Sequence, residues 1–108
     1  MTLRPVEFHV LLALAADDLH GYAILQEVAR LTDGDLEIEP GTLYRALHRM
    51  LKDGWVVESL RRPAADVDDE RRRYYRLTPL GRRVAMTEAD RLSRLLSVAR
   101  AHKLVSRA

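Results

Sequence analysis

The sequence predicts a mainly α-helical domain that contains a small β-hairpin and ends in a long helix. Three observations lead to this fold class. Several segments repeat apolar residues at helical spacing. Two short β-type runs, residues 55–60 and 72–77, flank a polar tract. The chain of 108 residues is 47% apolar and 31% charged, a size and composition that fit one globular domain with one appended element.

The first two predicted helices cover residues 5–16 and 22–32. Pro5 suits a first helical position. One apolar face of the first helix is made of Val6, Val10, Leu11 and Leu14. We expect a turn at residues 17–21, where His20 lies at a turn or a helix start. The second helix then places Ile24, Val28 and Leu31 on one stripe.

Residues 42–53 show the clearest amphipathic pattern, and we expect Thr42 to cap this third helix. Its buried face is predicted to contain Leu43, Ala46, Leu47, Met50 and Leu51. Gly54 is placed to end the helix in a left-handed conformation. The helix therefore has one face for the core and one face for solvent or a partner.

The hairpin is predicted from WVVESL at residues 55–60 and RRYYRL at residues 72–77. Tyr74 and Tyr75 are adjacent in a strand, so we expect them to point to opposite faces, with one of them in the core. Trp55 is interpreted as a structural residue that covers the start of the sheet.

The last helix is signalled by Thr78 as N-cap and Pro79 as first helical residue. Its stripe is made of Leu80, Val84, Leu92, Leu95 and Ala99. The preceding elements leave nothing to cover so long a stripe, which favours a two-fold dimer. We therefore divide the chain into residues 1–78 and a dimerisation helix at residues 79–108.

The predicted elements follow the order of a winged helix-turn-helix with one more helix at its end. They are three helices, a strand, a charged loop, a second strand and a long helix. The charge is unevenly distributed along the chain. Residues 1–40 contain two basic and eight acidic residues, whereas residues 41–108 contain sixteen basic and eight acidic residues. Such a split indicates a polyanionic partner for the second portion.

The solvent face of the third helix carries polar and basic residues every three to four positions: Thr42, Arg45, His48, Arg49 and Lys52. Such a face fits a major groove, where it meets base edges and the flanking phosphates. We therefore predict that this helix recognises double-stranded DNA. An ordinary solvated helix face is the alternative interpretation.

The hairpin base is rich in arginine. We expect Arg61, Arg71, Arg72 and Arg73 to bind phosphates or a minor groove, together with Arg62 and Arg76. The tip at residues 66–70 is acidic except for Val67, and we expect it to stay in solvent. A surface loop that neutralises its own charges remains the alternative.

Several classes are disfavoured by what the sequence lacks. It contains no cysteine, no phosphate-binding glycine loop, no nucleophile-elbow serine and no histidine pair at metal-ligand spacing. We therefore expect no enzyme, no cofactor and no metal. No N-terminal signal pattern or long apolar run is present, so we expect no membrane association and a cytoplasmic, nucleoid-associated location.

Three ordered motifs resemble the PadR family of bacterial transcriptional regulators. They are HGYAI at residues 20–24, PGTLYRAL at residues 40–47 followed by Leu51 and GWV at residues 54–56, and RYYRLT at residues 73–78 followed by Gly81. The resemblance implies a cytoplasmic homodimeric repressor of the compact subfamily with one C-terminal helix, bound to an inverted-repeat operator. It also implies DNA contacts at Tyr22, Thr42, Tyr44 and Arg45.

The resemblance further implies a possible small-molecule effector at the dimer interface, since some members bind flat aromatic compounds there. Residues 79–108 contain no Trp, Tyr or Phe, which departs from an aromatic sandwich. The residues predicted to line such a site are Phe8, Val10, Leu11, Leu92, Leu95 and Leu96. A ligand-sensing dimer, or a winged-helix module that binds only proteins, is kept as an alternative function.

Overall fold

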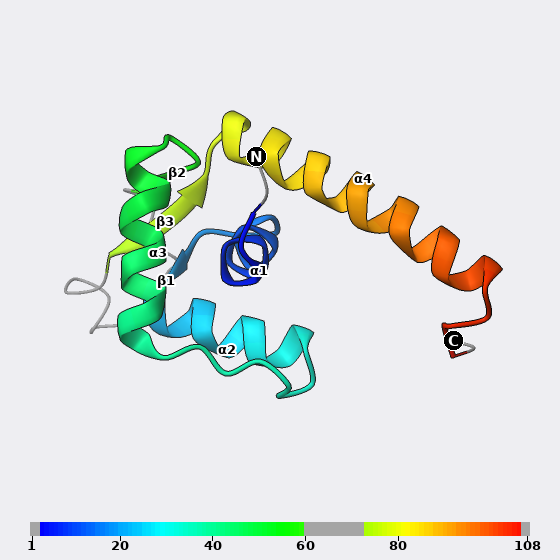
Figure 1. Cartoon of the computed structure of the whole chain (residues 1–108). Helices are drawn as coiled ribbons and strands as arrows, with labels where there is room; N and C mark the ends of the chain where they lie inside the picture. The colour runs from blue at the N-terminus through cyan, green and yellow to red at the C-terminus, as the bar shows by residue number, and fades with distance from the viewer. Residues whose placement is uncertain (1–2, 60–72, 107–108) are drawn as a thin grey trace.

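The computed structural model describes residues 3–59 and 73–106. Figure 1 shows the elements that these residues form. In chain order they are α1 (Pro5–Leu14), β1 (Leu19–His20), α2 (Gly21–Leu31), α3 (Pro40–Lys52), β2 (Val56–Ser59), β3 (Tyr74–Leu77) and α4 (Pro79–Ala101). The predicted mainly helical fold with a small sheet is confirmed.

The core lies among α1, α2 and α3. Helix α1 is central: it contacts α2, α3, α4 and β3. The fully buried side chains come from all three helices and from β2: Val10, Leu11, Ile24, Val28, Leu43, Leu47, Met50 and Val56. Each buried Leu or Ile contributes roughly 1.5–3 kcal/mol. These side chains join the three helices in one core.

The sheet has three strands in the order β1-β3-β2, and both pairings are antiparallel. Residues 19 and 20 were predicted to lie in a turn, which is wrong for this pair: Leu19 lies opposite Tyr75, and His20 opposite Tyr74. Two residues are too short to show an alternating pattern, and their pairing partner lies far along the chain. The strand was therefore invisible to periodicity.

Both tyrosines of β3 are buried, Tyr74 at 4% exposure and Tyr75 at 5%. Adjacent strand residues do point to opposite faces, but β3 is the central strand and both of its faces are covered. Tyr75 joins the main core. Tyr74 packs edge-on against the His20 ring, with 5.3 Å between ring centroids. The prediction that one of the two lies in the core is confirmed, and the other is buried as well.

The ends of the helices follow local chemistry, with one correction. Helix α3 begins at Pro40, after Glu39, and not at a Thr42 cap. Pro40 fixes the φ angle of the first helical residue, so the helix starts two residues earlier than expected. The predicted left-handed Gly54 is confirmed by its φ of +79°. The predicted N-cap Thr78 is also confirmed, because its hydroxyl accepts a hydrogen bond of 2.9 Å from the Gly81 N–H.

Trp55 and Gly81 hold the start of α4 against the sheet. Trp55 is 5% exposed and belongs to the core, which agrees with its predicted structural role. Its carbonyl accepts hydrogen bonds from the Thr78 N–H and hydroxyl at 3.0 Å each. A Cβ at residue 81 would overlap this same carbonyl. Only glycine permits so close an approach of α4 to Trp55.

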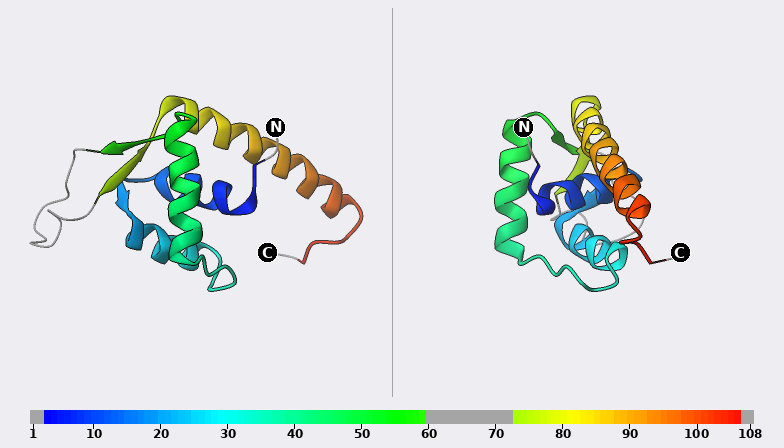
Figure 2. Two further views of the ribbon diagram at one scale, coloured as in Figure 1. Left: turned by 60° about the vertical axis from the view of Figure 1, so that its left-hand side comes forward. Right: turned by 45° about the vertical axis from the view of Figure 1, so that its right-hand side comes forward.

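Helix α4 projects from the body of the molecule (Figures 1 and 2). Its first turns pack on the core through Val84 and Ala85. Further along, large apolar side chains are exposed: Leu92, Leu95, Leu96 and Val98. The later part of the predicted apolar stripe, at Leu92 and Leu95, is therefore left uncovered by the described residues. Within residues 3–59 and 73–106, no helix is both long and apolar enough to cross a membrane.

Candidate nucleic-acid interface

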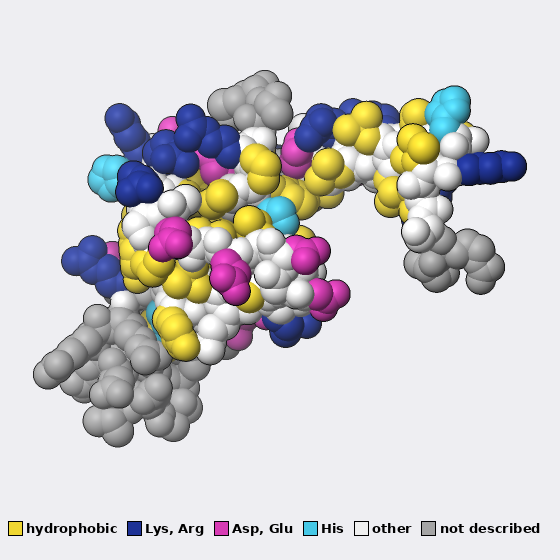
Figure 3. Space-filling model, turned by 60° about the horizontal axis from the view of Figure 1, so that its bottom comes forward, with side chains coloured by type: hydrophobic (Ala, Val, Ile, Leu, Met, Phe, Trp, Pro, Cys, Tyr) yellow, Lys and Arg dark blue, Asp and Glu magenta, His cyan; other side chains and the backbone are white. Residues whose placement is uncertain are grey.

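Helix α3 presents a polar and cationic face to solvent. Its apolar face is buried except for Leu51, which was predicted to lie in the core but is 38% exposed near the end of the helix. Tyr44 is 51% exposed, and Arg45, His48 and Lys52 are also exposed. Figure 3 shows Lys and Arg side chains, with a histidine, gathered at the edge of the body where α3 lies. The sequence prediction of a two-faced helix is confirmed by this burial pattern.

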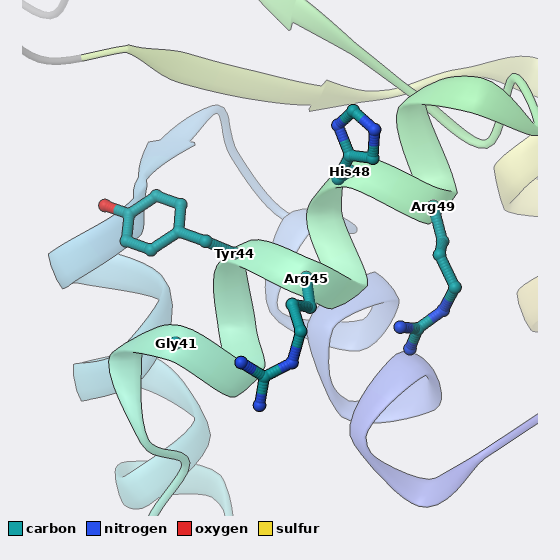
Figure 4. Close-up of a pocket in the computed structure, with 5 residues that line it drawn as sticks. All are labelled: Gly41, Tyr44, Arg45, His48 and Arg49. Carbon is teal, nitrogen blue, oxygen red and sulfur yellow. The ribbon is translucent and has the colours of Figure 1, made fainter.

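The exposed face of α3 forms an open hollow of about 410 Å³, lined by Gly41, Tyr44, Arg45, His48 and Arg49. Tyr44 and His48 project on one side of the helix, and Arg45 and Arg49 on the other (Figure 4). An Nη atom of Arg45 donates a hydrogen bond of 3.3 Å to the Thr42 hydroxyl. Thr42 thus lies beside Arg45 and steadies its guanidinium.

The start of α2 lies next to this face. The His20 Nδ1 accepts a hydrogen bond of 3.1 Å from the Ala23 N–H, so His20 is the predicted helix-start residue. Its ring stacks on Tyr22 at 6.5 Å, with 5° between the planes, and Tyr22 is 61% exposed. A Cβ at residue 21 would overlap the Tyr44 hydroxyl. Gly21 therefore lets Tyr44 lie against the start of α2, near Tyr22.

Arg49 and Lys52 complete the predicted set on α3. Lys52 is exposed at the end of the helix. Arg49 is engaged within the fold: its Nε lies 3.7 Å from Glu7 Oε2 of α1. This ion pair could not be predicted from the sequence, because the two residues are far apart in the chain and lie on different helices.

The base of the hairpin is held by a buried carboxylate that sequence reasoning missed. The Asp18 carboxylate accepts a hydrogen bond of 2.6 Å from the Ser59 hydroxyl and one of 3.0 Å from Arg76 Nη2. This bond to Asp18 raises the pKa of Arg76 above its usual range. Arg76, which we also expected to bind DNA, joins the turn before β1 to β2 and β3.

Among the other predicted wing arginines, Arg73 is exposed immediately before β3. Arg61, Arg62, Arg71 and Arg72 lie outside the described residues, and so does the acidic tip at residues 66–70. Their role in binding remains a prediction. A titratable cluster able to hold a metal ion is absent from residues 3–59 and 73–106.

The structure separates the predicted effector residues into two groups. Val10 and Leu11 are fully buried in the core, and Phe8 is half-buried beside it. Leu92, Leu95 and Leu96 are exposed on α4. One chain therefore does not bring these six residues together around a pocket, and a site that uses the exposed leucines stays a prediction for a dimer.

The comparisons with known proteins agree with this geometry. The model of the transcriptional regulator PadR-like family matches residues 10–87. The chain is 41% identical over 86 residues to the transcriptional regulator Rv3488 of Mycobacterium tuberculosis, covering 80% of this chain and 73% of that protein.

Two solved structures show the same fold. A transcriptional regulator from Clostridium thermocellum has a TM-score of 0.70 at 28% identity, covering 94% of this chain and 90% of that one. PadR of Bacillus subtilis in complex with operator DNA has a TM-score of 0.61 at 18% identity, covering 82% of this chain and 47% of that one.

Proposed function

The chain belongs to the transcriptional regulator PadR-like family, and from that premise we propose that it is a homodimeric repressor that binds an inverted-repeat operator in the cytoplasm. Proteins of this family are transcriptional regulators and not enzymes. The regulator similar in fold from Bacillus subtilis was solved with operator DNA, which supports DNA as the ligand here.

The exposed face of α3 carries this proposal. Bidentate guanidinium contacts are the commonest way to read guanine in a major groove, and Arg45 is exposed and steadied by Thr42. Tyr44 and His48 are exposed and line the same hollow as Arg45, so they are available to base edges. Tyr22 reaches the same side from α2, while Lys52 and the wing arginines supply charge for phosphates.

The proposed dimer rests on the exposed stripe of α4. Leu92, Leu95 and Leu96 are 38%, 53% and 41% exposed in the single chain. Apolar surface of this kind, continuous along a helix, is buried most simply against the same helix of a second copy. A two-fold axis through α4 would present two α3 helices to two half-sites that mirror one another.

Selection of binding sites from random duplex DNA at physiological salt tests the proposal as a whole. We expect an enriched inverted repeat. Enrichment of a single half-site would overturn the dimeric reading, and binding without enrichment would mean that only phosphates are recognised. If no duplex is retained, DNA binding by the free protein is refuted.

Arg45→Ala tests the role of α3 within that result. Loss of a bidentate guanine contact is expected to cost about 1–3 kcal/mol and to relax the preference at one base position. The measurement is a repeat of the selection with the variant, together with titration of the enriched duplex. Equal weakening on all sequences would instead make Arg45 a phosphate contact.

A further inference from the structure

Glu7 of α1 is a buried carboxylate that contacts α3. Its side chain is 10% exposed, that of Arg49 is 42% exposed, and 3.7 Å separates Glu7 Oε2 from Arg49 Nε. The other oxygen, Glu7 Oε1, accepts a hydrogen bond of 2.9 Å from the Arg4 backbone N–H. The carboxylate is thus tied to the start of α1 by one oxygen and faces the arginine with the other.

This arrangement restricts Arg49 more than Glu7. A buried carboxylate is costly unless a donor or a cation compensates it, so the guanidinium is drawn toward it. Glu7 is fixed by a buried helix and by its bond to the backbone, whereas a free arginine side chain samples many rotamers. Among the described residues, Glu7 is the one ion-pair partner of Arg49.

The 3.7 Å contact is made through Nε and not through the terminal amino groups of Arg49. Figure 4 shows Arg49 leaving α3 on the side opposite Tyr44 and His48, toward α1, and it lines the same hollow. Two terminal amino groups in one plane match a phosphate bidentately. Residue 49 lies in the second half of α3, and recognition helices read bases mainly with their first half. A backbone phosphate is therefore the fitting ligand.

Building on the proposed DNA binding, we propose that Glu7 is a positioning residue, which holds Arg49 so that its terminal amino groups bind a backbone phosphate beside the groove. Glu7 itself does not touch DNA in this scheme. Removing a negative charge would by itself strengthen binding to a polyanion. A loss of affinity when Glu7 is removed is therefore the signature of positioning.

The test is a double-mutant cycle on the duplex enriched by selection. We expect Glu7→Ala and Arg49→Ala each to lower affinity about fivefold, and the double variant to bind no more weakly than Arg49→Ala alone. Arg49→Ala should also flatten the plot of log affinity against log salt by about one unit, because one phosphate contact is lost. Glu7→Ala should flatten it as well, by no more than Arg49→Ala does, because the misplaced arginine no longer binds that phosphate.

Two further variants keep the result decisive. Glu27→Ala removes a carboxylate that pairs with Arg30 at 2.6 Å on α2, and it should leave affinity unchanged or slightly higher. If Glu7→Ala does not fold, Glu7→Gln keeps the volume, removes the charge and should show the same dependence on Arg49. Tighter binding by the Glu7 variant, or an equal loss with and without Arg49, would overturn the proposal. Failure of the unmodified protein to bind any selected duplex would instead refute the proposed function.

Discussion

Gly21 lies at the point where the start of α2 meets Tyr44 of α3. Since a Cβ here would overlap the Tyr44 hydroxyl, Gly21→Ala should push the ring out of place. We expect an affinity loss of about tenfold, the effect of one lost contact to DNA. Titration of the enriched duplex measures it, with Gln26→Ala on the same helix as control. Unchanged affinity would show that Tyr44 does not contribute to binding.

Tyr75 makes stability depend on alkaline pH. Burial raises its pKa from 10.0, and the nearby Tyr44 and Glu58 raise it further, against an opposing effect of Arg73. The fold therefore favours the neutral phenol. This contribution is complete below pH 10.0 and is lost as the pH rises through the raised pKa.

The free energy of unfolding of the Tyr75→Phe variant should consequently fall less than that of the unmodified protein as the pH rises from about 9 to about 11. Urea unfolding at a series of pH values in this range measures the difference. Tyr22→Phe, at a residue that is 61% exposed, is the matched control and should follow the unmodified curve. Parallel curves for all three proteins would contradict the assignment.

Individual residues also mark the limit of sequence reasoning about the site. The exposed side chains of α3 could be predicted because amphipathic spacing separates them from the core by itself. The roles of Glu7 and Asp18 could not be predicted, because each depends on a partner that lies on another element. For the same reason, the contact of Arg76 with Asp18 could not be predicted from a run of arginines.

Among the elements, the small sheet depends on the Asp18 carboxylate that joins β2 and β3 to the turn before β1. Asp18→Asn weakens its bonds to Ser59 and Arg76. Arg76 is about half exposed, so we expect a modest loss of about 1–2 kcal/mol in the free energy of unfolding. Urea denaturation measures it, and Asp90→Asn on the exposed face of α4 serves as control. A loss no larger than that of the control would refute the anchoring role.

The helices were easier to predict than the strands for a physical reason. A helix shows its pattern within a few turns, so the stop at Gly54 and the start at Thr78 were visible locally. Strand β1 is formed by pairing with β3, and Tyr74 packs edge-on against His20 of that strand. Features created by long-range pairing left no local pattern to detect.

At the scale of the whole molecule, the exposed stripe of α4 predicts self-association. Leu95→Glu places a charge in the middle of that stripe and should convert a dimer to a monomer. Sedimentation equilibrium measures the mass directly. Ser97→Glu, on the other side of the same helix, should leave the mass unchanged. Equal masses for the Leu95 variant and the unmodified protein would place the interface elsewhere.

Both the family and the general architecture could be predicted from the sequence, because three motifs occur in the right order over most of the chain. The operator could not, because base preference depends on how α3 sits in the groove. Effector binding is likewise undetermined by one chain, since Val10 and Leu11 are buried while the leucines of α4 face outward.

The uncovered leucines of α4 also bear on how a promoter would respond to the amount of this protein. If two chains must form a dimer before both half-sites are bound, the dimer is the species that occupies the operator. When most chains are monomers, the dimer concentration falls with the square of the protein concentration. A modest drop in synthesis, or dilution during growth, would then release the promoter abruptly. The strength of the contact between two α4 helices would set the threshold of that switch.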